Sequence, residues 1–222
     1  MKAHPLASLV CAAAAPVWAV LVVPMPPAAA DPCPDVEVVF ARGTTEPPGV
    51  GGVGQNFVDT LRSHVGAKSL GVYPVNYPAT TDFPTAADGI ADAGNHIESM
   101  ATHCPKTKMV LGGYSQGAAV MGFVTYSQVP DGVHLIQVLQ PMPPEVADHV
   151  AAVALFGKPS GQFMSIINEP PITIGPAYAA KTIDLCVPND PVCSGSGMPG
   201  AHHQYVEAGM VDQAANFAAS RL

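Results

Sequence analysis

The stretch KMVLGGYSQGAAV, residues 108–120, joins an apolar run to a helix-forming run through a serine enclosed by glycines. Residues 108–114 predict a buried strand, and the residues from Ser115 onward favour a helix. Gly113, Ser115 and Gly117 fit the pattern G-x-S-x-G, which in a strand–turn–helix setting is typical of a nucleophile elbow. An ordinary glycine-rich turn can give the same letters, so the pattern alone is weak. The rest of the chain has to supply partners for the serine.

The elements around this stretch alternate between strands and helices. Such alternation predicts a mainly parallel sheet covered on both faces, in a single three-layer α/β domain. We found no internal repeat, charge run or linker that would mark a domain boundary. Four other strands are expected at residues 36–42, 71–77, 150–157 and 179–186. Helices are expected at residues 55–66, 115–129 and 205–220, and a further helix is entered from the loop at 78–89 and ends at about residue 104.

The first thirty residues have the pattern of a secretory signal peptide. A short basic start with Lys2 is followed by an apolar stretch and by Ala28-x-Ala30. A membrane anchor is the alternative, but Pro16 and Pro24 break the apolar run, which is shorter than the roughly 20 residues that a span needs. We expect residues 1–30 to be cleaved and residues 31–222 to form one secreted domain.

The charge balance argues against nucleic acid as a partner. The chain has 9 Lys and Arg against 17 Asp and Glu, a formal net charge of −8. An acidic surface repels phosphate backbones and anionic membrane faces. Because no later stretch is long and apolar enough to span a bilayer, stable membrane insertion is not expected either.

Four cysteines remain once the signal peptide, with Cys11, is removed. An even number in an oxidising compartment favours two disulfides, for which three connectivities are possible. The short spacing of Cys186 and Cys193 suggests a local loop and leaves Cys33 with Cys104 as a long-range tie. Zinc binding is a weaker alternative because the chain has no C-x-x-C pair.

A serine nucleophile needs a base and an acid, which in a fold with this elbow follow in the order Ser, acid, His. Asp190 comes just after the last predicted strand, between Cys186 and Cys193. His202 and His203 lie in a later loop. Ligands of open α/β sheets bind at the carboxyl ends of the strands, where these residues are expected. The alternative for Asp190 is an ordinary turn residue before a proline.

Two groups could stabilise an oxyanion. The elbow would aim the amide of Gln116, at a helix N-terminus, at an incoming carbonyl. A second donor should come from a loop after an early strand, and Thr44 lies in such a loop, ARGTTE at residues 41–46. Thr44 could donate its amide and its hydroxyl, although it could also be an ordinary loop residue.

These motifs resemble the cutinases, in particular the secreted cutinase-like esterases of actinobacteria. The similarity covers nearly all of the mature chain, and its segments are DPCPDVEVVFARGTTEPPGVG, YPVNYPA, GGYSQGAAV, VALFGKPS, CVPNDPVCSGS and HHQY. The resemblance implies a minimal α/β-hydrolase fold with a five-stranded parallel sheet and no lid. It implies a catalytic triad of Ser115, Asp190 and His202, oxyanion donors Thr44 and Gln116, and disulfides Cys33–Cys104 and Cys186–Cys193.

The chain departs from the family at one position and leaves one choice open. Lys158 stands after LFG, where the family often has Asp or Asn. His203, beside His202, keeps the identity of the base slightly open, although H-x2-Y with Tyr205 favours His202.

The activity implied is hydrolysis of short- to medium-chain acyl esters, with polyesters such as cutin or lipids as further candidates. It would proceed through an acyl-enzyme, with no metal or organic cofactor, in a monomer. The alternatives are a phospholipase or thioesterase that uses the same triad, and a non-catalytic secreted binding protein. Phe83 and Met198, in the loops 77–84 and 194–201, are the residues expected to contact the acyl chain.

Overall fold

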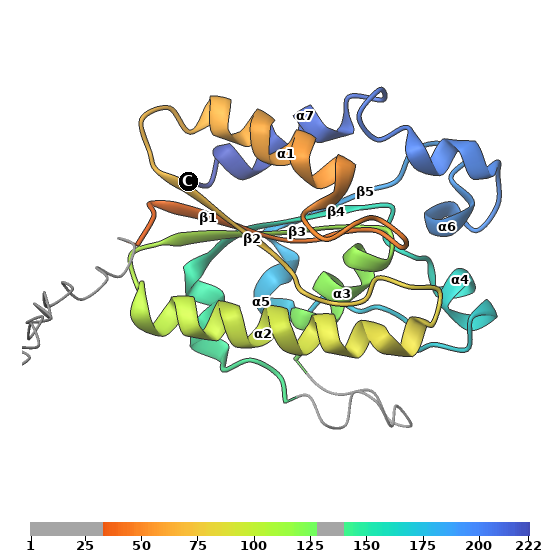
Figure 1. Ribbon diagram of the computed structural model, residues 1–222, viewed down its shortest axis with the longest axis horizontal. Helices are drawn as coiled ribbons and strands as arrows, with labels where there is room; N and C mark the ends of the chain where they lie inside the picture. The colour runs from red at the N-terminus through yellow and green to blue at the C-terminus, as the bar shows by residue number, and fades with distance from the viewer. Residues whose placement is uncertain (1–32, 128–139) are drawn as a thin grey trace, which may run out of the picture. The chain divides into compact units, whose positions relative to one another are not determined.

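The computed structural model describes residues 33–127 and 140–222. Their centre is a five-stranded sheet in the order β2-β1-β3-β4-β5, in which every neighbouring pair is parallel (Figure 1). The predicted α/β fold with five parallel strands is therefore confirmed. The strands are β1 (Val36–Ala41), β2 (Leu70–Pro74), β3 (Lys108–Tyr114), β4 (Val150–Phe156) and β5 (Thr182–Leu185).

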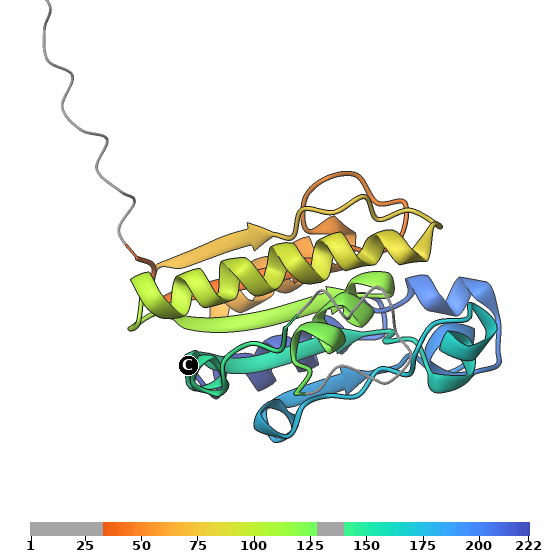
Figure 2. The ribbon, with the colours of Figure 1, turned by 90° about the horizontal axis from the view of Figure 1, so that it is seen from below.

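Helices cover both faces of the sheet. On one face lie α1 (Gly51–His64) and α7 (Met210–Ala219), and on the other α2 (Ala86–His103), α3 (Gln116–Val124) and the short α5 (Pro176–Ala179). In the turned view of Figure 2 the yellow-green α2 runs along its face of the sheet. The remaining short elements are η1 (Phe83–Thr85), η3 (Pro144–His149), α4 (Gly161–Ile166), α6 (Pro191–Ser194) and η4 (Pro199–His203).

Two apolar clusters, one on each face, hold these layers together. Val36, Val38 and Phe40 of β1 pack toward α1 and α7, while Val39 and Ala41 belong to the cluster on the opposite face. All five side chains are almost completely buried. A strand buried on both faces has no polar side, which explains why the strand segments read as continuous apolar runs.

Several boundaries differ from the sequence-based expectation. Helix α1 begins at Gly51 instead of residue 55, and β5 covers only Thr182–Leu185 of the expected 179–186, because Ala179 belongs to α5. The last helix begins at Met210 instead of Tyr205, because Gly209 before it adopts a left-handed φ of 69°. The second strand ends at Pro74, and it is an edge strand, where a missing N–H is tolerated. The expected signal peptide and the end of the helix predicted at 115–129 lie outside the described residues, and α3 ends at Val124.

Two disulfides join Cys33 to Cys104 and Cys186 to Cys193, so none of these four thiols is free to bind zinc. The first ties the residues before β1 to the end of α2. The second closes a loop directly after β5. Among the helices of residues 33–127 and 140–222, none has the length and apolar character needed to cross a membrane.

The parallel sheet brings three loops to one edge. Ala41 pairs with Gly113, Tyr114 with Phe156, and Phe156 with Leu185, so β1, β3, β4 and β5 end side by side. The loops that leave these ends carry Thr44, Ser115 and Asp190. Residues more than 140 positions apart in the chain therefore come together at the carboxyl edge.

Candidate active site

Ser115 lies in a strained turn between β3 and α3. Its φ of 55° and ψ of −117° belong to a region that side chains other than glycine rarely occupy. Its amide donates to the Phe156 carbonyl of β4 over 2.8 Å, which fixes the turn to the sheet. The turn thus presents the hydroxyl above the strand ends.

Gly113 and Gly117 flank Ser115 at positions where the turn has no room for a larger residue. A Cβ on Gly113 would lie 2.2 Å from the Gly117 carbonyl oxygen, and one on Gly117 would lie 1.9 Å from the carbonyl oxygen of Ala41. Both distances are far inside van der Waals contact with rigid backbone. The glycines of the G-x-S-x-G pattern therefore allow α3 to pack closely against the ends of β1 and β3.

The side chains of Ser115, His202 and Asp190 form a chain of hydrogen bonds. Nε2 of His202 lies 2.8 Å from Oγ of Ser115, and Nδ1 lies 2.7 Å from Oδ2 of Asp190. An ionised carboxylate can only accept, so Nδ1 carries the ring proton and Nε2 is the acceptor for the serine. His203 lies elsewhere: its Nδ1 is 3.3 Å from the hydroxyl of Tyr114.

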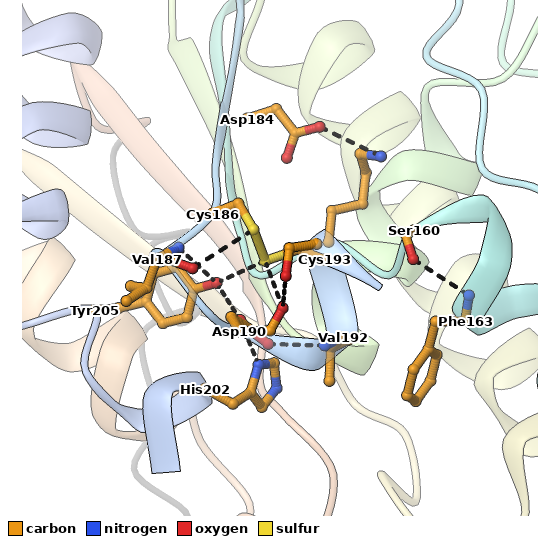
Figure 3. Close-up of a disulfide and its surroundings, with 12 residues drawn as sticks. Ser160, Phe163, Asp184, Cys186, Val187, Asp190, Val192, Cys193, His202 and Tyr205 are labelled. Atoms are coloured by element: carbon orange, nitrogen blue, oxygen red, sulfur yellow. Dashed lines mark hydrogen bonds and ion pairs between the residues drawn. A yellow bond between two sulfur atoms is a disulfide. The ribbon is translucent and has the colours of Figure 1, made fainter. Parts of the chain in front are cut away.

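Asp190 is completely buried and each of its carboxylate oxygens has a partner. The amide of Val192 donates to Oδ1 over 2.9 Å, and the hydroxyl of Tyr205 donates to Oδ2 over 2.5 Å. Figure 3 shows the carboxylate between His202, Tyr205 and the Cys186–Cys193 disulfide. The closed loop and its hydrogen bonds hold the carboxylate toward the imidazole.

Tyr205 is the member of this network that sequence reasoning missed. Burial, together with the hydrogen bond to Asp190, raises the pKa of the phenol well above its usual range, so the hydroxyl stays a donor. The tyrosine entered the sequence argument only as a marker in H-x2-Y. The clue available was a tyrosine one helical turn after the histidine, which places both side chains near one acid.

Thr44 and Gln116 approach Ser115 from the β1 loop and from the start of α3. The first residue of a helix has an amide without an intrahelical acceptor, which leaves that of Gln116 available. Oγ1 of Thr44 is 3.5 Å from Oε1 of Gln116, and Nε2 of Gln116 donates to the Thr80 carbonyl over 3.0 Å. The two residues predicted as oxyanion donors therefore lie in contact with each other.

Two charged residues that the sequence analysis overlooked hold the Thr44 loop. Nε of the buried Arg42 donates to the Glu46 carbonyl over 2.8 Å, and its Nη2 to the Tyr77 carbonyl over 2.6 Å. The Glu46 carboxylate accepts from the amides of Gly43 and Gly52. An arginine directly after a buried strand was the signal that could have identified this support.

A pocket of about 700 Å³, open mouth included, lies beside Ser115. Phe83 belongs to its wall, as expected. Met198 does not line it: its amide is bound to the Asn189 carbonyl and its side chain is 72% exposed. The lining consists of Thr44, Phe83, Pro84, Ala86, Ala87, Ile90, Ser115, Gln116, Ala119, Phe123, Pro159, Phe163, Met164, Ile167 and Glu169.

Lys158, the departure from the family pattern, pairs with a neighbouring strand. Its ammonium group lies 3.3 Å from Oδ2 of Asp184 in β5. Within the described ranges, no three His, Cys, Asp or Glu side chains come together in a group that could hold a metal ion.

Comparison with known proteins places this geometry in a family. The family profile described as Cutinase matches residues 32–222. The chain is 64% identical over 168 residues to the probable carboxylesterase Culp5 of Mycobacterium tuberculosis, covering 76% of this chain and 96% of that protein. It is 50% identical over 220 residues to the phospholipase Culp4 of the same organism, covering 99% and 93%.

A solved structure agrees with these relatives. The Trichoderma reesei cutinase in complex with a C11Y4 phosphonate inhibitor superposes with a TM-score of 0.63 and 34% identity, over 85% of this chain and 76% of that one. A profile match over nearly the whole domain, with relatives at half to two thirds identity, leaves no other family to consider. The chain belongs to the cutinase family.

Proposed function

We propose that this chain is a secreted serine esterase in which Ser115 is the nucleophile, His202 the general base and Asp190 the acid that orients the base. Membership of the cutinase family makes the chain a carboxylic ester hydrolase. The observation that carries the assignment of roles is the line of two short hydrogen bonds from Oγ of Ser115 through the imidazole to the buried carboxylate.

The reaction would begin as Nε2 of His202 takes the proton of Ser115 while Oγ attacks the ester carbonyl. The amides of Thr44 and Gln116 would donate to the oxyanion of the tetrahedral intermediate. The imidazolium then gives its proton to the leaving alcohol, and the acyl group remains on Oγ. Water, deprotonated by the same imidazole, attacks the acyl-enzyme and releases the carboxylic acid.

Asp190 would have two tasks in this cycle. It keeps the proton on Nδ1, so that Nε2 is free to accept from the serine, and it stabilises the imidazolium that forms. Because a protonated imidazole cannot act as a base, activity should fall as the pH falls through the range in which histidine takes up a proton. A rate that stays flat between about pH 4 and pH 9 would contradict this mechanism.

The substrates proposed are short- to medium-chain acyl esters, with polyesters and lipids as further candidates. The support is the pocket beside Ser115, in which 11 of the 15 lining residues are apolar and which would receive an alkyl chain. A second candidate, phospholipid hydrolysis, is favoured by the similarity to a protein named phospholipase Culp4. A thioesterase and a non-catalytic binding protein remain the alternatives to test against.

Labelling with a fluorophosphonate tests the catalytic assignment. The wild-type protein should be labelled, and the Ser115→Ala variant should not. Ser63→Ala is the matched control, because Ser63 is exposed on α1 and bonds only to the Thr60 carbonyl within its own helix. Absence of labelling in the wild type, or labelling of Ser115→Ala, would overturn the proposal.

A substrate panel tests the specificity. Nitrophenyl esters of graded chain length, an acyl-thioester and a phospholipid should be compared by kcat/KM. We expect the esters of short to medium length to be the better substrates.

We further propose that residues 1–30 are a cleaved signal peptide and that the secreted protein is a monomer of residues 31–222. Two disulfides support an oxidising destination. Mass spectrometry of the exported protein should give Asp31 as its first residue, and light scattering should give the mass of one chain.

A further inference from the structure

Glu169 is the one charged residue in the lining of the pocket beside Ser115. The three other polar residues of the lining have partners: Ser115 forms a hydrogen bond with His202, Gln116 forms one with the Thr80 carbonyl, and Thr44 contacts Gln116. In the described part of the chain, the Glu169 carboxylate makes no hydrogen bond and no ion pair, although its backbone amide donates to the Met164 carbonyl. The triad mechanism gives this carboxylate no role.

The surroundings of Glu169 disfavour the charged form of its carboxyl group. Eleven of the fifteen lining residues are apolar, and three of them are the phenylalanines 83, 123 and 163. Partial burial raises the pKa of the Glu169 carboxyl, because the charged form loses hydration, and no neighbouring charge contributes to the shift. An anion in such a place is stabilised when a cation that needs little hydration comes beside it.

We infer that Glu169 and the phenylalanine rings form an anionic subsite that selects ester substrates carrying an alkylated ammonium group. This inference rests on the proposed esterase function of the same pocket. An alkylammonium group presents a positive charge inside an apolar surface. It can therefore pair with the carboxylate and contact aromatic faces while leaving no hydrogen bond unmade.

The charge of the whole chain favours the same class of substrate. With a formal net charge of −8, the protein attracts cations over its surface as well as in the pocket. An uncharged alkyl chain placed against Glu169, instead of against the apolar residues of the lining, would cover the carboxylate without pairing it, and an anionic group there would be repelled. Glu169 would thus act through binding, as a specificity-determining residue, with no part in proton transfer.

The test uses two esters that differ only in charge. Butyrylcholine and 3,3-dimethylbutyl butyrate have the same shape, and a quaternary carbon in the second replaces the nitrogen of the first. We expect the wild type to favour butyrylcholine by about tenfold in kcat/KM. In Glu169→Gln, which keeps the size of the side chain and removes the charge, the ratio should fall close to one.

A matched variant and a pH series sharpen the result. Glu145→Gln removes an exposed glutamate outside the pocket lining and should keep the wild-type ratio. The ratio should also fall as the pH falls through the pKa of Glu169, because the protonated carboxyl has no charge. Both esters are attacked by the same Ser115–His202 pair, so any effect of pH on that pair cancels in the ratio.

A binding measurement that needs no catalysis separates this inference from the proposed function. Calorimetry with tetramethylammonium should detect binding to Ser115→Ala and a loss of binding in Ser115→Ala combined with Glu169→Gln. Equal ester ratios in the wild type and Glu169→Gln, or tetramethylammonium binding that does not depend on Glu169, would overturn the subsite. A wild type that binds tetramethylammonium but is not labelled by the fluorophosphonate would overturn the proposed catalytic function and leave the subsite standing.

Discussion

The hydroxyl of Tyr205 donates to Oδ2 of Asp190, the same oxygen that accepts the Nδ1 proton of His202. Both the phenol and the carboxylate are completely buried, so water does not compete for these contacts. The ring of Tyr205 also packs edge-on against Phe156 and His202. One tyrosine therefore fixes the acid by a hydrogen bond and the base by a ring contact.

Replacing Tyr205 by Phe should lower kcat by about tenfold, since a hydrogen bond to a charged group contributes roughly 1.5–3 kcal/mol. The carboxylate, no longer sharing its charge with the phenol, should hold the imidazolium more tightly. The acid limb of the pH–rate profile should therefore move to higher pH. Tyr178→Phe, which changes a buried tyrosine of the opposite apolar cluster, should leave the profile in place. If the pH–rate profile of Tyr205→Phe equals that of the wild type, Tyr205 contributes packing only.

The two adjacent histidines should respond very differently to substitution. His202→Ala removes the group 2.8 Å from the serine, and kcat/KM for a nitrophenyl butyrate should fall by about 10³-fold or more. His203→Ala loses the contact with Tyr114 and an edge-on ring contact with His202, and should stay within about tenfold of the wild type. A larger loss in His203→Ala than in His202→Ala would show that the base has been assigned to the wrong ring.

Gly117→Ala should destabilise the fold and inactivate the enzyme, because its Cβ would overlap the Ala41 carbonyl oxygen. Overpacking of this kind costs about 1–3 kcal/mol in the free energy of unfolding, measured with urea. Gly94→Ala is the matched control, a glycine within α2 whose added Cβ would meet nothing within 4 Å. It should stabilise the protein by about 0.5–1 kcal/mol. A Gly117→Ala variant as stable and active as the wild type would contradict the close packing at the elbow.

Buried tyrosines should make the protein sensitive to alkali. Burial raises the pKa of Tyr178 to about 12, and those of Tyr77, Tyr114 and Tyr205 further. A raised pKa means that the folded state holds the proton more tightly than the unfolded state. This contribution to stability is complete below the ordinary tyrosine pKa near 10 and is lost as the pH rises through the raised values. Urea unfolding at increasing pH should show the loss, and Tyr178→Phe should reduce it.

The fold could be predicted from the sequence because its signals are local. The apolar strand runs, the glycines around Ser115 and the cysteines around Asp190 each carry their meaning within a few residues. The parallel sheet then brings the ends of these runs to one edge whatever the side chains elsewhere. For that reason Thr44, Ser115 and Asp190 could be selected without coordinates.

The supporting residues could not be selected in the same way, because their contacts join distant segments. Arg42 bonds to Tyr77 and Tyr205 to Asp190, and no periodicity encodes which side chain faces which. Met198 was expected to contact the acyl chain because its loop is near the site, but its side chain faces solvent. Loop residues are positioned by tertiary hydrogen bonds, and sequence patterns do not report the direction of a side chain.

The side chain of Gln116 connects two loops of the site. Its Nε2 binds the Thr80 carbonyl, three residues before the pocket residue Phe83, and its Oε1 meets Thr44. A substrate chain that displaced Phe83 would act on the segment that holds the Gln116 side chain, next to the nucleophile. We therefore expect the length of the acyl chain to change kcat as well as KM, because a chain that displaces Phe83 would also disturb the contacts of Gln116.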